Sequence, residues 1–267
     1  MKNSIVKFSF FFLITIFTFS TDAFSQKRKD EIFNSKWSAK EFTIDGQLSD
    51  WKDSLQINES NELKFSVANN GSTIFFALKN ADPLQIAKIL RFGLTVSVNT
   101  KERKLAAPSI TYPILEVGGV KSKTAQKSNP TSGEIESKQK DALSRAKSMS
   151  ISGFEDLMDG QISLENTYGF KAGSIFNNEN ELQIELAIPL KELDIDKDFT
   201  DPIYINVKIN SPERVSYSKE TTYDPYTRMG RRSMGNIYNQ REESIRKNTI
   251  KTSSDFWIIS KLATPLN

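Results

Sequence analysis

Cysteine and histidine are both missing from the 267 residues of this chain. Without cysteine there is no disulfide framework, no cysteine-based zinc or iron–sulfur site and no lipid-anchoring thiol. Without histidine there is no catalytic triad with a histidine base and no haem held by an axial histidine. The net charge of only +3 argues against nucleic acid as a main partner. No glycine-rich phosphate loop or nucleophile elbow is present either, so the sequence predicts no enzyme.

Residues 1–25 have the pattern of an export signal. Two lysines precede an uncharged and strongly apolar run from Phe8 to Thr21, and Ala23 and Ser25 place small residues where a signal peptidase cleaves. The run has 14 residues, shorter than the about 20 that span a bilayer, and an uncleaved anchor is the alternative. We predict an exported protein, periplasmic or extracellular, with no membrane span after cleavage. It must depend on its hydrophobic core for stability, because it has no disulfides.

Alternating apolar and polar residues predict β-strands through much of the remaining chain. The period of two is clearest in residues 94–99, 182–188 and 203–209. Asn69-Asn70-Gly71 separates two more apolar runs and is typical of a hairpin turn. A last strand is expected over 255–262. The fold class predicted is an all-β antiparallel sandwich, immunoglobulin-like or jelly-roll-like, formed by a single domain of residues 26–267.

One short helix and two long polar loops interrupt the strands. Asp82 suits the N-cap of a helix, Pro83 its first position and Gly93 its end. Residues 116–150 and 213–251 are rich in polar and charged side chains, and we predict both as flexible insertions. Loops of this length are either functional or disordered.

A motif near the start of the strand region carries a family resemblance. The run Ile44-Asp45-Gly46-Gln47-Leu48-Ser49-Asp50-Trp51 resembles the I-D-G-x-L-x-x-W opening of carbohydrate-binding module family 9 and its DOMON-like relatives. Further matches follow in the family's order, at Phe75-Phe76-Ala77-Leu78, at 94–99 and at Glu185-Leu186-Ala187-Ile188-Pro189-Leu190. The resemblance covers about residues 41–115 and 160–263. It implies a β-sandwich in which sugars are held between exposed aromatic rings, sometimes with structural calcium. The structural residues of the motif would be Asp45, Gly46, Leu48 and Trp51.

Three aromatic residues are candidates for sugar binding. Trp37 lies outside the motif and either is exposed or holds the N-terminal arm against the fold. Tyr168 opens the strand before Phe170, and Tyr204 lies on the polar face of its strand. Trp51 and Trp257 are predicted as core residues because both lie in apolar surroundings. The first hypothesis is an exported, non-catalytic carbohydrate-binding protein.

Two groups of carboxylates have several interpretations. Acidic residues near a turn offer hard oxygen ligands for Ca²⁺, and the candidates are Asp45, Asp50 and Asp53. A second group contains Asp156, Asp159 and Glu165. Either group can instead serve ordinary turn and cap chemistry, or supply the two carboxylates of a hydrolase. The sequence thus predicts either no cofactor or structural calcium.

The 213–251 stretch supports an alternative function. Arginine and tyrosine are favoured at protein interfaces, and the candidates here are Tyr226, Arg228, Arg231 and Arg232. The second hypothesis is a protein–protein interaction or assembly module on the same fold. A solvated loop explains the same residues without a partner.

Overall fold

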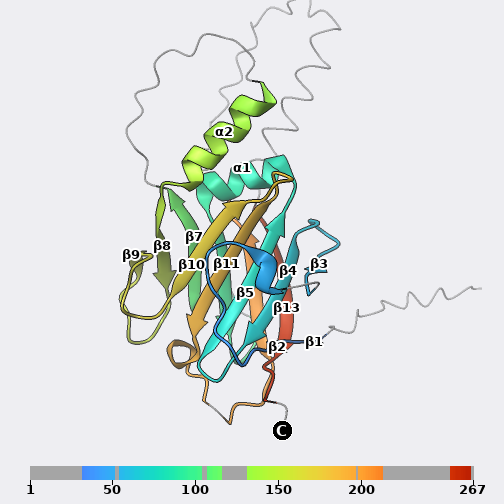
Figure 1. Cartoon of the computed structure of the whole chain (residues 1–267). Coiled ribbons are helices and arrows are strands. Elements are labelled where there is room, and N and C mark those ends of the chain that lie inside the picture. The colour runs from blue at the N-terminus through green and yellow to red at the C-terminus, as the bar shows by residue number, and fades with distance from the viewer. Residues whose placement is uncertain are drawn as a thin grey trace, which may run out of the picture. The chain divides into compact units, whose positions relative to one another are not determined.

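Two β-sheets packed face to face form the protein (Figure 1). The computed structural model describes residues 32–51, 54–103, 107–115, 131–196, 198–212 and 253–265, all within one compact unit of residues 31–267. The larger sheet has the order β1 (Ile32–Asn34), β13 (Ser254–Lys261), β12 (Ile203–Ile209), β6 (Leu94–Asn99), β7 (Ser109–Leu115), β8 (Ala146–Ser152) and β9 (Gly160–Ser163). The smaller sheet has the order β10 (Lys171–Phe176), β11 (Leu182–Pro189), β5 (Thr73–Asn80), β4 (Lys64–Asn69) and β2 (Lys36–Trp37), with β3 (Gln56–Ile57) also paired to β4.

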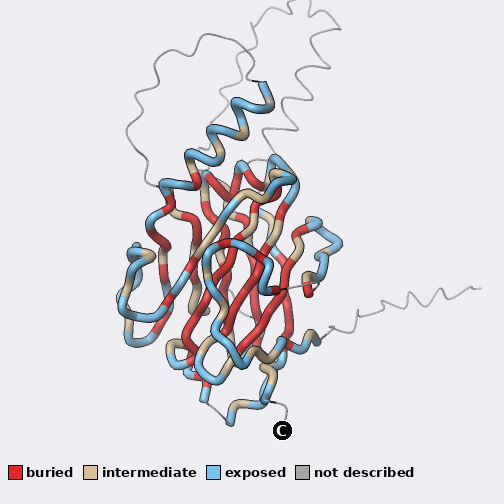
Figure 2. Tube along the Cα trace, in the orientation of Figure 1, coloured by how far each residue is buried: buried red, intermediate tan, exposed pale blue. Residues whose placement is uncertain are grey.

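The predicted all-β sandwich is confirmed, although its sheets are mixed. Neighbouring strands are antiparallel except for β1 with β13 and β2 with β4, which are parallel. The runs with the clearest period of two became β6, β11 and β12. Their apolar residues point inward, and the buried positions lie along the strands between the two sheets (Figure 2). Alternation predicted these strands because one face of each sheet is packed on the core.

The predicted helix forms where its capping residues stand. α1 (Pro83–Phe92) begins after Asp82, whose Oδ1 accepts hydrogen bonds from the N–H groups of Leu84 and Gln85 at 2.7 and 2.8 Å. It ends at Gly93, whose N–H donates to the carbonyl of Ile89. Its apolar side packs on β7 and β12. Among the described residues, no helix has the length and apolar character needed to cross a membrane.

A second helix corrects the prediction of a flexible insertion over 116–150. α2 (Ser132–Leu143) starts with a capping box between Thr131 and Glu134, and β8 follows it almost at once. Met149 and Ile151 of β8 are buried in the core. The polar composition of this segment is misleading because Ser148 and Ser150 alternate along β8 with the apolar residues that face the core. Residues 116–130 lie outside the described residues.

Trp257 is a second correction, since it is half-buried on the outer face of the larger sheet and does not lie in the core. It stands opposite Asn206 on β12, whereas its neighbours Phe256 and Ile258 point inward. In a run of four apolar residues such as 256–259, the sequence does not show which residues face the core. The pairing of the strand with its neighbours determines this.

The middle of the smaller sheet's outer face is covered by residues 38–51, which we term the crossing segment (Figure 1). Beneath it the sheet presents small side chains, at Ser66, Ala68, Ala77, Gly173 and Ala187. Leu48, Trp51 and Phe75 form a small apolar cluster between segment and sheet. Segment and sheet approach closely at Gly173, where a Cβ would lie only 2.7 Å from the backbone nitrogen of Gly46.

This close approach predicts that Gly173→Ala destabilises the protein by about 1–3 kcal/mol, the usual range for overpacking a filled space. The reason is that the obstructing atoms are backbone and cannot rotate away. Gly133→Ala on α2 is the matched control, because nothing lies within 4 Å of its Cβ position. That change is expected to stabilise by up to about 1 kcal/mol. Denaturant unfolding of both variants measures the difference, and equal effects would contradict the prediction.

Candidate functional site

The carboxylate of Glu185 holds the crossing segment on the sheet. Its Oε2 accepts hydrogen bonds from the backbone N–H groups of Asp45 and Gly46 at 3.0 and 2.7 Å. Its Oε1 accepts one from the indole Nε1 of Trp51 at 2.7 Å. Glu185 is fully buried. Two of the motifs that resemble family 9 are thus in direct contact, one supplying the carboxylate and the other the three donors.

The remaining motif residues also serve the architecture of the segment. Asp45 accepts hydrogen bonds from the backbone N–H and the side-chain amide of Gln47, at 2.8 and 3.1 Å. Gly46 has φ +89°, and a Cβ there would lie 2.6 Å from the backbone of Ser174, so only glycine fits. Leu48 and Trp51 are buried.

Burial raises the pKa of Glu185, and the hydrogen bond from the Trp51 indole is the chief opposing effect. A carboxylate without a neighbouring cation depends on its donors to offset the cost of leaving water. All three donors aim at it from the crossing segment, so this group is a structural clamp with no oxygen open to a ligand.

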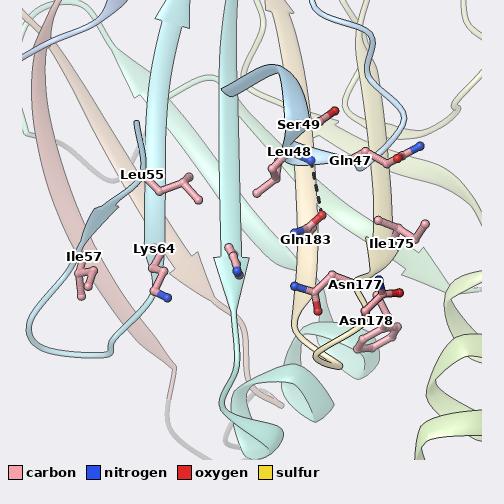
Figure 3. A pocket seen from close by; sticks show the side chains of 12 residues that line it. Gln47, Leu48, Ser49, Leu55, Ile57, Lys64, Ile175, Asn177, Asn178 and Gln183 are labelled. Atoms are coloured by element: carbon pink, nitrogen blue, oxygen red, sulfur yellow. Dashed lines mark hydrogen bonds between the residues drawn. The ribbon is translucent and has the colours of Figure 1, made fainter. Parts of the chain in front are cut away.

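An open groove lies beside the crossing segment, on the same face of the smaller sheet (Figure 3). Its volume is about 730 Å³. One row of paired residues crosses its floor over five strands, in the order Ile57, Lys64, Lys79, Gln183, Ile175. Three polar side chains therefore stand between an apolar residue at each end, and both of these isoleucines are exposed.

Hydrogen bonds orient part of this row. The backbone N–H of Leu48 donates to Oε1 of Gln183 at 3.4 Å, which leaves the amide NH₂ of Gln183 as a donor toward the groove (Figure 3). Lys79 forms an ion pair with Glu181, and Asn177 also donates to that carboxylate at 2.7 Å. Hydrogen bonds and charge from Lys79 lower the pKa of Glu181, against the opposing effect of its burial.

Two further pockets lie at the opposite end of the same sheet, and we term them the end pockets. The first, of about 280 Å³, is lined by Trp37, Asn69, Asn70, Gly71, Leu190, Asp196, Phe199, Leu262, Ala263, Thr264 and Pro265. The second, of about 590 Å³, is lined by Glu41, Gly71, Ser72, Thr73, Thr167, Tyr168, Gly169, Lys171, Pro189, Leu190, Lys191, Ile195 and Asp196. They adjoin, because Gly71, Leu190 and Asp196 belong to both.

Trp37 reaches the first end pocket through strand pairing. β2 runs parallel to β4, with Trp37 opposite Asn69. Asn69 is buried and binds both main-chain groups of Ala263, donating to its carbonyl at 2.9 Å and accepting from its N–H at 2.8 Å. It also accepts a hydrogen bond from Ser35. The side chain of Asn69 on β4 therefore connects Ser35, the residue before β2, with the C-terminal segment next to the pocket.

Tyr168 reaches the second end pocket from a tight loop. Asn166 accepts a hydrogen bond from the N–H of Tyr168 at 3.1 Å and donates to the carbonyls of Ser163 and Phe170. Gly169 follows with φ +90°. Tyr168 is 43% exposed, so the residue is accessible from solvent at the pocket.

The other predicted residues do not join these pockets. Tyr204 lies on β12 of the larger sheet, paired with Asn99 and Ile259. Asp50 is exposed in the short 3₁₀ turn Leu48–Trp51. Asp53 and the interaction-loop residues Tyr226, Arg228, Arg231 and Arg232 lie outside the described residues, as do residues 1–25.

Two of the acidic candidates, Asp45 and Asp159, serve turns. Asp159 accepts hydrogen bonds from the N–H of Gly153 at 2.7 Å and from Ser152 at 2.8 Å, and these bonds lower its pKa. Within the described ranges, no three acidic side chains gather as a metal-binding group. Sequence reasoning did not find the groove, because its row depends on the register of five strands.

Comparisons with known proteins find similarity only among solved structures. No protein family matches the chain, and no curated protein matches it. A family 9 carbohydrate-binding module from Caldicellulosiruptor kristjanssonii in complex with cellotriose is 7% identical, with a TM-score of 0.31 over 68% of this chain and 77% of that one. The structure of such a module in complex with glucose is also 7% identical, with a TM-score of 0.31 over 68% of this chain and 79% of that one. A candidate carbohydrate-binding protein from Bacteroides uniformis is 8% identical, with a TM-score of 0.34 over 67% of this chain and 83% of that one.

Similarity this low assigns no ligand to the chain. Two of these structures belong to the family that the motifs resemble, while the relationship to DOMON-like proteins stays a prediction.

The raised pKa of Glu185 predicts a pH-dependent stability. A carboxyl whose pKa is higher in the folded state binds its proton more tightly there than in the unfolded chain. The contribution to stability is therefore full below the ordinary value of 4.5 and is lost as pH rises through the folded pKa. Glu185→Gln removes this titration, so its free energy of unfolding should fall less than that of the wild type as pH rises from 4 toward neutrality.

Denaturant unfolding across that pH range tests the prediction. The exposed Glu59 supplies the control, since Glu59→Gln should keep the pH dependence of the wild type. If Glu185→Gln has the same slope as Glu59→Gln, the buried carboxyl does not titrate as described.

Proposed function

We propose that this chain is an exported, non-catalytic carbohydrate-binding protein whose end pockets hold sugar rings. One observation carries the proposal: Trp37 and Tyr168, which are far apart in sequence, line two pockets that adjoin through Gly71, Leu190 and Asp196. Aromatic faces suit the C–H faces of pyranose rings, and nearby polar groups orient the hydroxyls.

The lining of the end pockets supplies both kinds of contact. Trp37, Phe199, Leu190 and Leu262 make the first pocket largely apolar. The second pocket adds hydroxyl and charged groups at Thr73, Lys171, Lys191, Glu41 and Asp196. Lys171 and Glu41 form an ion pair of 2.6 Å, so the two side chains lie together in the wall of the pocket. Such a mixture binds neutral polar ligands that also have apolar faces.

The proposed export rests on the sequence, and the proposed lack of catalysis rests on the sequence and on the contacts of two carboxylates. The apolar run with its small-residue cleavage pattern supports export. The carboxylates of Glu185 and Asp159 are committed to backbone donors in the fold. They are therefore poor candidates for the acid and base of a hydrolase, which must both face the scissile bond.

The protein–protein alternative has its candidate residues outside the described part of the chain. It becomes the better hypothesis if the folded protein binds no glycan.

A glycan array with the full chain, with and without calcium, tests this proposal. We expect binding to at least one glycan, with no release of reducing ends. Trp37→Ala and Tyr168→Ala should each weaken it about tenfold, which corresponds to about 1.4 kcal/mol for a lost aromatic contact. Tyr204→Ala is the matched control and should bind like the wild type, because Tyr204 lies on the other sheet. Failure of the folded chain to bind any glycan, or equal losses in all three variants, would refute the assignment.

A further inference from the structure

The groove of Figure 3 has a different chemistry from the end pockets. We propose that it is a second glycan site, which binds the anionic group of an acidic sugar, a uronate carboxylate or a sulfate ester, through Lys64. The inference rests on the proposed function in that its ligand is a glycan, but it uses a separate surface of the protein.

The first step is the spacing of the row across the groove. Neighbouring strands lie about 4.8 Å apart, so the row from Ile57 to Ile175 spans about 19 Å over its four intervals. It lies across the strands and stays open because the crossing segment covers the adjacent rows only. An oligosaccharide laid along this row meets an apolar side chain at each end and polar side chains between them.

The second step is the charge on the floor of the groove. Lys64 and Lys79 stand directly opposite each other on antiparallel strands, an arrangement in which like charges repel. Glu181 neutralises Lys79. Over the part of the chain that the structure describes, no carboxylate lies within ion-pairing distance of Lys64. With Lys79 neutralised in this way, a ligand anion would supply the counter-charge that Lys64 lacks among the described residues.

The third step is the pattern of hydrogen-bonding groups around Lys64. The groove also contains the amides of Gln47, Asn177, Asn178 and Gln183. Amides both donate and accept, as sugar hydroxyls do, and the bond from Leu48 directs the NH₂ of Gln183 toward the ligand. Most of the floor consists of side chains on the face of the sheet, and strand edges occur only at its two ends, on β3 and β10, so an extended peptide along the row could not pair with a strand. These features favour a glycan over an acidic peptide.

Titration calorimetry with the full chain and matched ligand pairs tests the proposal. One pair is an oligogalacturonate and its methyl ester, which removes the charge and keeps the sugar. The other is a sulfated glycosaminoglycan fragment and its desulfated form. Together they distinguish carboxylate from sulfate. We expect the charged member of at least one pair to bind at least tenfold more tightly, with a preference that weakens as salt increases.

Substitutions then locate the anion. Lys64→Gln should weaken binding of the charged ligand about tenfold and leave the neutral ligand unchanged, whereas Lys64→Arg should retain most of the affinity. Lys101→Gln is the matched control, because Lys101 is an exposed lysine outside the groove. Thermal unfolding shows that each variant is folded.

The outcomes separate this proposal from the proposed function. Equal binding of charged and neutral ligands, or equal effects of Lys64→Gln and Lys101→Gln, would overturn the acidic-sugar site alone. If charged glycans bind but Trp37→Ala leaves all binding intact, the groove site stands and the end-pocket assignment falls. If no glycan binds the folded protein, both proposals fail.

Discussion

The buried carboxylate of Glu185 determines how the outer face of the smaller sheet is arranged. It binds three donors that lie 134 to 140 residues earlier in the chain. Among the described residues no cation balances its charge, so the three N–H groups must offset the cost of burying it. The bonds press the crossing segment onto Gly173 and place Phe42 and Trp51 in a stack with their ring centroids 4.4 Å apart. Without them this apolar cluster would be open to water.

Because the crossing segment covers only the middle of the sheet, both ends of the outer face remain open. One end has the groove, with ammonium and amide groups on its floor. The other end has the end pockets, with aromatic and aliphatic walls. A single β-sheet thus presents two surfaces of different chemistry, and a fault in the clamp would disturb both. Loss of binding in a Glu185 variant would therefore indicate a disturbed architecture and would not show that Glu185 contacts the ligand.

Sequence reasoning predicted features that depend on near neighbours. Alternation predicted β6, β11 and β12, and capping residues predicted α1, because each pattern is complete within a few residues. The role of Glu185 was not predictable, since nothing in its own strand shows which donors it meets. The groove was not predicted for the same reason: Lys64, Gln183 and Ile175 share a row only after three strand pairs have set their register.

Trp37 shows how the structure resolves two alternatives that the sequence left open. The residue is half-buried, and it pairs through β2 with Asn69 while its side chain lines an end pocket, so it lies between the two alternatives. The ring lies beside the hairpin turn, since a Cβ at Gly71 would lie 3.9 Å from it. Strand pairing fixes the backbone of Trp37, so the ring starts from a defined position in the pocket wall before a ligand binds. That pre-organisation favours affinity from a small contact area.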